Sequence, residues 1–139
     1  MTLPVNYTTT VPASRTVGEM QAALAKRGAA AVAITYGPGG NPAGMTFMLR
    51  GSHFQLPVDV DAMHRLLRRE TSGKRAERAH AERVAWRVVK DWLNAQLSLV
   101  DAGMTGLDEV MLPYLVVGPD RLLRDDWRDR KALTVGADA

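Results

Sequence analysis

The chain has 139 residues and no cysteine, and its 18 Lys or Arg against 15 Asp or Glu give a net charge of +3. This length predicts one domain over residues 1–139 with a single hydrophobic core. Without cysteine, disulfides, thiolate metal sites and cysteine nucleophiles are excluded. The N-terminal segment lacks the basic start and long apolar run of a signal peptide, and no apolar stretch approaches the ~20 residues of a membrane span. We therefore expect a cytoplasmic protein with no membrane contact.

The N-terminal residues predict a short strand and a helix. Residues 5–11 alternate in the period-two pattern of a strand. Thr16 and Glu19 have the spacing of a capping box, in which each side chain satisfies an amide of the first helical turn. This pattern predicts a helix over residues 17–27 that Gly28 ends.

Three period-two segments follow, and their repetition is typical of a half-buried antiparallel sheet. They cover residues 30–36, 45–49 and 53–58. The Gly-Ser pair at residues 51–52 predicts a two-residue hairpin turn between the last two strands. The expected sheet has three strands, or four if residues 5–11 pair with it. This sheet part is expected to occupy residues 1–58.

The following part, residues 59–132, is predicted to be helical. Asp59 is the expected cap of its first helix. A long helix with a wide apolar stripe is expected from about residue 81 to 100. Between these helices, residues 71–80 are either a mobile linker or the polar first turns of the long helix.

The end of the chain predicts a highly charged helix with Asp120 as its cap, and then a frayed tail over residues 133–139. The predicted fold class is therefore α+β. A small antiparallel sheet carries helices on one face and is followed by a helical C-terminal half.

The central segment is basic, and this suggests an anionic partner. Residues 65–100 hold nine Lys or Arg against four Asp or Glu, net +5, whereas the residues after them are net −3. On a helix, Arg83, Arg87 and Lys90 share one face, and Trp86 borders it. Cations neutralise phosphates, and an exposed ring can stack on a base. The predicted nucleic-acid-binding residues are Arg65, Arg68, Arg69, Lys74, Arg75, Arg78, Arg83, Trp86, Arg87 and Lys90.

The same segment has a second interpretation as an ordinary amphipathic helix. Arginine stems often cover apolar surface, and Glu77 and Glu82 can pair with neighbouring arginines. Trp92 lies in the apolar stripe and is predicted to belong to the core. Trp86 can belong either to the core or to the binding face.

No set of residues argues for an enzyme. The three histidines lack the spacing of a metal site. The glycine-rich residues 37–44 lack the Gly-Lys-Ser/Thr of a phosphate loop and read as a hairpin loop. The alternating charges around Trp127 are explained by helical salt bridges. We expect no catalytic residue, no metal and no cofactor.

Three segments resemble a known family. They read "VPASRTVGEMQAALAKRGA", "ERVAWRVVKDWLNAQLSLVDAGM" and "LDEVMLPYL". Together they are similar to a family of small, mostly uncharacterised proteins encoded in phage and prophage genomes. The resemblance implies a viral or prophage origin, action in the host cytoplasm and a role near DNA replication or recombination. It carries over no catalytic residue.

Two functions follow as hypotheses. The first is a non-enzymatic accessory protein of phage DNA replication or recombination that binds single-stranded DNA through the basic helical face. The second is a protein-interaction module, either a phage factor that binds a host or phage enzyme or a self-assembling scaffold, because the long helix has a wide apolar stripe. One continuous exposed face of cations would favour nucleic acid. Dispersed cations, or cations paired with the Asp-rich C-terminal segment, would favour interaction.

Overall fold

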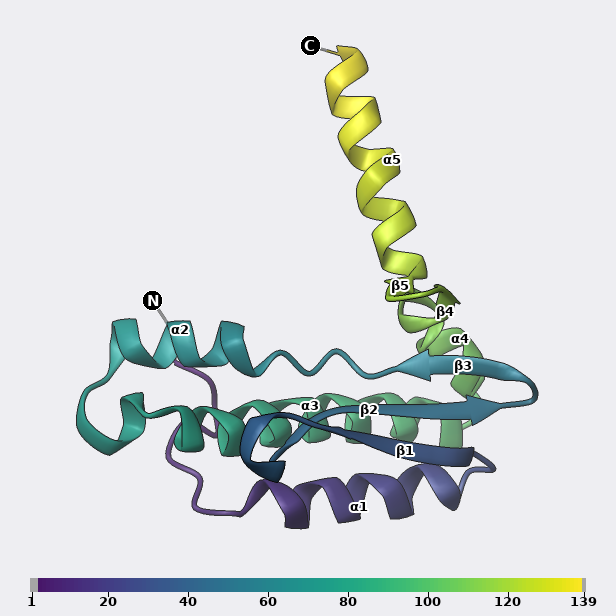
Figure 1. Ribbon diagram of the computed structural model, residues 1–139. Coiled ribbons are helices and arrows are strands. Elements are labelled where there is room, and N and C mark those ends of the chain that lie inside the picture. Colours follow the sequence, from purple (N-terminus) through teal and green to yellow (C-terminus); the bar gives the residue numbers. More distant parts are fainter. Residues whose placement is uncertain (1–2, 139) are drawn as a thin grey trace.

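The computed structural model describes the backbone of residues 3–138 and the side chains of residues 3–134. It confirms the α+β fold class: a three-stranded antiparallel sheet with helices, followed by a C-terminal half that is mainly helical. Figure 1 shows an elongated body from which the last helix projects as an arm. Within the described residues, no helix combines the length and the apolarity that crossing a bilayer requires.

The sheet consists of β1 (Ala30–Tyr36), β2 (Pro42–Leu49) and β3 (Ser52–Gln55) in the order β1-β2-β3, with the short 3-10 helix η1 (Pro38–Gly40) between the first two. The three predicted strands are thus confirmed. The tight turn differs by one residue, because Leu49 pairs with Ser52 and the turn is Arg50–Gly51. Both turn residues have positive φ, 50° and 85°, which is the conformation whose twist matches the flanking strands.

The N-terminal residues form turns instead of a strand. Backbone bonds from Tyr7 to Pro4 and from Thr9 to Asn6 close these turns, so the possible fourth strand over residues 5–11 is absent. The segment lies against the long helix, where His80 Nε2 meets the Tyr7 carbonyl oxygen. These hydrogen bonds satisfy the backbone locally and remove the groups that a strand would pair.

Helix α1 (Ala13–Ala25) begins earlier than the sequence predicts, directly after Pro12. Proline starts helices readily because its missing N–H is not needed there. Thr16 is consequently fully buried inside the helix, and the predicted capping box is wrong. The Glu19 carboxylate is therefore available for contacts with other side chains.

The main core lies between the sheet, α1 and the long helix α3 (Arg78–Asp101). The alternation of β2 turns Met45, Phe47 and Leu49 inward, and the rings of Phe47 and Phe54 stack with centroids 5.4 Å apart. The buried residues of the two helices are Val17, Met20, Leu24, Trp86, Val89, Leu93 and Leu97. Figure 1 shows α3 running along the length of the sheet.

A second core joins α2 (Val60–Glu70) to the first turns of α3. The predicted cap is confirmed, because the Asp59 carboxylate accepts from the Ala62 amide at 3.0 Å. Residues 71–80 are neither a plain linker nor one helix: they contain η2 (Gly73–Ala76), and α3 begins at Arg78.

The C-terminal part contains α4 (Leu107–Val110), η3 (Leu112–Tyr114), the hairpin β4 (Val116–Gly118) and β5 (Arg121–Leu122), and α5 (Leu123–Asp138). The sequence did not predict this hairpin. Asp120 lies in its turn with a φ of 51° and is not a helix cap. Asp125, in the first turn of α5, instead accepts from the Leu122 amide that precedes the helix, at 2.8 Å. Helix α5 runs through Asp138, so the predicted frayed tail is wrong for the described residues; Ala139 lies outside them.

Candidate functional site

Trp86 is a core residue. Its side chain is 0% exposed, and its indole N–H donates to the Pro42 carbonyl oxygen at 3.1 Å. This bond satisfies the one polar group of the ring and ties α3 to the start of β2. The prediction that Trp86 stacks on a base is therefore wrong. Trp92, predicted for the core, is half-buried and meets the Tyr114 ring edge-on at 5.5 Å.

The cationic stripe of α3 is not an open face either. Arg87 Nη1 lies 3.2 Å from a Glu19 carboxylate oxygen, and Lys90 Nζ contacts the same oxygen. The Arg87 and Lys90 side chains are only 17% and 20% exposed. Arg83 is half-buried, with its guanidinium 3.3 Å from His80 Nδ1. One carboxylate of α1 thus pairs with two cations of the stripe, Arg87 and Lys90, and these ion pairs stabilise the α1–α3 contact.

The remaining predicted cations gather at one end of the body, where α2 leads through η2 into α3 (Figure 1). They are all exposed: Arg65, Arg68, Arg69, Lys74, Arg75 and Arg78. Acidic residues lie among them, since residues 59–82 hold six Lys or Arg against five Asp or Glu. Net +1 is a weak field for attracting a polyanion.

Three of these cations have partners within the protein, beginning with Arg69, whose Nε lies 3.3 Å from Glu70 Oε1. Arg78 Nη1 lies 2.6 Å from Asp61 Oδ1, and this hydrogen bond lowers the pKa of Asp61. The Arg75 guanidinium lies over the Tyr7 ring, 5.4 Å from its centroid. The predicted binding residues are therefore dispersed over two places, one partly buried and paired with Glu19 and one exposed.

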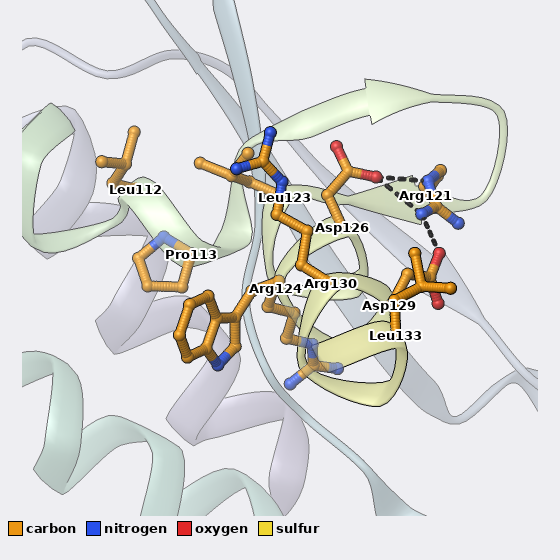
Figure 2. Close-up of a pocket in the computed structure, with 10 residues that line it drawn as sticks. Leu112, Pro113, Arg121, Leu123, Arg124, Asp126, Asp129, Arg130 and Leu133 are labelled. Atoms are coloured by element: carbon orange, nitrogen blue, oxygen red, sulfur yellow. Dashed lines mark hydrogen bonds and ion pairs between the residues drawn. The ribbon is translucent and has the colours of Figure 1, made fainter. Parts of the chain in front are cut away.

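A concave feature lies at the base of α5, outside the predicted site. It is a groove of about 670 Å³ between η3 and α5. Its residues are Leu112, Pro113, Arg121, Leu123, Arg124, Asp126, Trp127, Asp129, Arg130 and Leu133. Figure 2 shows Leu112 and Pro113 on one wall and the α5 side chains on the other.

The floor of this groove is apolar and exposed. Trp127 is 66% exposed, Leu133 is 74% exposed and Leu112 is 50% exposed. Leu123, Trp127 and Arg130 follow one another at helical spacing of four and three residues, so they share one face of α5. This helical spacing is visible in the sequence, but the acidic neighbours of Trp127 are typical of an exposed charged helix.

One edge of the groove is fixed by ion pairs. Arg121 lies 2.6 Å from Asp126 and also contacts Asp129, and hydrogen bonds to Asp129 and Asp126 raise the pKa of Arg121. The Leu123 amide donates to the Leu115 carbonyl oxygen at 2.8 Å. These bonds hold the hairpin and the first turns of α5 in one arrangement, so the groove is preformed.

The rest of the described chain offers little for catalysis. The other resolved pKa shifts belong to a surface ion pair: Arg27 donates to Asp101 at 2.9 and 2.7 Å, which raises the pKa of Arg27 and lowers that of Asp101. Among residues 3–134, no group of three His, Asp or Glu side chains is placed to hold a metal ion.

Comparison with protein-family models, with curated proteins and with solved structures finds no match. The resemblance to phage and prophage proteins stays a prediction.

Proposed function

We propose that this protein is a protein-interaction module without catalytic chemistry of its own, and that its partner docks in the groove between η3 and α5. The observation that carries this proposal is the exposure of Trp127 and Leu133, 66% and 74%, on a helix that projects from the body. Exposed apolar side chains that gather in a groove with a polar rim are typical of a binding site.

The form of α5 supports a docking role. A helix of 16 residues is marginal in water unless an apolar face is packed. Within the described chain, its first turns are anchored through Leu123 and through Arg124, whose guanidinium lies 5.5 Å from the Tyr114 ring centroid. A docked partner would cover the apolar face beyond this anchor and stabilise the helix.

The composition of the groove also suits a protein partner. Tryptophan and arginine dominate the binding energy of protein interfaces, and here Trp127 lies between Arg124 and Arg130 in one groove. Because the Arg121 ion pairs already fix the edge, little conformational entropy is lost on binding. An apolar centre with a charged rim is the usual anatomy of such a site.

A site-specific photocrosslink tests the proposal. A photoreactive amino acid at Arg130, inside the groove, should yield a covalent adduct with a protein in cells of the source organism. The matched control is Ser98, an exposed position on α3, where we expect no adduct. Trp127→Ser should abolish the adduct at position 130. Equal crosslinking at both positions, or none at either, would refute a docking role for the groove.

A second candidate, the nucleic-acid function, is favoured by the exposed cations at the α2–η2 end. Arg65, Arg68 and Lys74 would contact phosphates there, and the phage replication or recombination role would follow from single-stranded DNA binding. Titration of a labelled single strand should show binding at low salt. Arg68→Ala or Lys74→Ala should each reduce the salt slope by about 0.7.

The control for this titration is Lys131→Ala, since Lys131 is an exposed cation on α5, far from the α2–η2 end in Figure 1. No binding at low salt, or an equal loss with all three variants, would remove the nucleic-acid candidate. The outcome does not bear on the groove.

A further inference from the structure

This inference rests on the proposed function of the groove. We infer that its partner is a second copy of this chain, and that the two α5 helices pack antiparallel across a twofold axis. Each copy then contributes the same surface, which is the arrangement of most homodimers.

The apolar residues of α5 fit such a pairing. If the axis crosses the helix at the level of Arg128, residues at equal distances on either side of it face each other. Leu123 of one copy then meets Leu133 of the other, since each lies five residues from position 128. Trp127 lies beside the axis, so the two indoles come together at the centre. All three apolar side chains are groove residues.

The charges of α5 are self-complementary in the same register. Along α5, the carboxylates Asp125, Asp126 and Asp129 come before the cations Arg130 and Lys131. Antiparallel packing brings Asp126 of one copy opposite Arg130 of the other, and both are groove residues. Parallel packing would place like charges opposite each other, which is unfavourable.

The ion pairs within one copy leave Arg130, Lys131 and part of the Asp126 carboxylate available for contacts with a second copy. Arg130 and Lys131 are exposed and have no ion-pair partner among residues 3–134. Asp126 binds Arg121, but its side chain is 43% exposed, and a carboxylate has two oxygens that accept several hydrogen bonds. The second copy therefore supplies the partner that Arg130 lacks.

The mass of the full chain in solution tests this pairing. Light scattering should give twice the 15.2 kDa of one chain. Trp127→Ser removes two central side chains per dimer and should raise the dimer dissociation constant about 100-fold or more. Circular dichroism and thermal unfolding should remain those of the folded body, which distinguishes lost association from misfolding.

A charge exchange tests the register. Asp126→Arg and Arg130→Asp each place like charges opposite each other, so each variant alone should be monomeric. Mixed together they should form a heterodimer, because the arginine introduced in one copy then faces the aspartate introduced in the other. Arg128→Asp is the matched control: it is an exposed charge reversal outside the groove and should leave the dimer in place.

The outcomes separate the two proposals. A monomer at every concentration, together with a position-130 crosslink to a different protein, would overturn the homodimer and leave the docking role standing. A monomer without any crosslink would overturn both. A dimer that persists in Trp127→Ser and shows no pairing in the charge-exchange mixture would use another surface and would also overturn this inference.

Discussion

Two helices of this protein carry the same local pattern, Arg-x-x-Trp-Arg, with opposite outcomes. In α3 it is Arg83 to Arg87, and Trp86 is 0% exposed; in α5 it is Arg124 to Arg128, and Trp127 is 66% exposed. The intervening residues differ, being Val-Ala in α3 and Asp-Asp in α5. An apolar flank lets a sheet and a second helix close over the ring. Acidic neighbours stay hydrated, so the tryptophan ring beside them remains exposed to solvent.

The arginines differ in the same way. In α3, Arg87 reaches across to Glu19 of α1, 68 residues away in the sequence. The carboxylates of α5 pair instead with Arg121 of β5, which lies only five and eight residues before them in the sequence. The Glu19 pair joins two helices that are far apart in the sequence, whereas the Arg121 pairs join β5 to the helix that directly follows it.

Replacing each tryptophan in turn should distinguish α3 from α5 most clearly, through its effect on the free energy of unfolding. Trp86→Ala leaves a cavity in the core and an unpaired Pro42 carbonyl, so the free energy of unfolding should fall by ~3–5 kcal/mol. Trp127→Ala should change it by less than ~0.5 kcal/mol, when measured at concentrations that keep the chain monomeric. Chemical denaturation gives both values. Similar losses for the two variants would contradict the contrast.

The next largest effect should come from Glu19. Glu19→Gln leaves Arg87 and Lys90 half-buried without a counter-charge, and we expect a loss of ~1–2 kcal/mol in the free energy of unfolding, less than for a fully buried pair because all three side chains are partly solvated. The control is Glu77→Gln, which changes an exposed carboxylate. If both variants are equally stable, the ion pair does not hold α1 on α3.

Fluorescence should distinguish the two rings in solution. In a variant that keeps only Trp127, a soluble quencher should reduce emission strongly in the monomer and less in the dimer. In a variant that keeps only Trp86, quenching should be weak at every concentration, because the ring is enclosed. Trp127 emission that is insensitive to concentration would argue against burial of α5 in a dimer.

The smallest effect concerns the Arg27–Asp101 pair, which joins the ends of α1 and α3. Its hydrogen bond lowers the pKa of Asp101 below 3.8, so the pair stabilises the folded state above that pH and is lost as the pH falls through the lowered pKa. The stability difference between the natural chain and Asp101→Asn should therefore be present near neutral pH and vanish in acid. A difference that persists at low pH would show that the charge is not its source.

Local patterns were sufficient for most of the regular structure. Alternation predicted the three strands, the Asp59 side chain predicted the start of α2, and helical spacing predicted the long helix to within a few residues. Each of these depends on contacts within a few positions along the chain. The errors had both distant and local causes. Residues 5–11 became turns against α3, and the hairpin β4–β5 formed where Leu115 pairs with Phe54 of β3. Helix α1 started early because of its neighbour Pro12.

For the candidate functional residues, too, some properties follow from the local sequence and others from the tertiary structure. The sequence by itself determined the charges, the amphipathic helices and the absence of cysteine chemistry, because these follow from residue type and short-range periodicity. Only the tertiary structure decided which tryptophan is covered and which arginines are neutralised. Burial depends on the elements that fold over a residue, and Glu19 and the sheet reach α3 from far away in the sequence. Helix α5 has no such cover within the described chain, and its exposed face is the surface we propose for a partner.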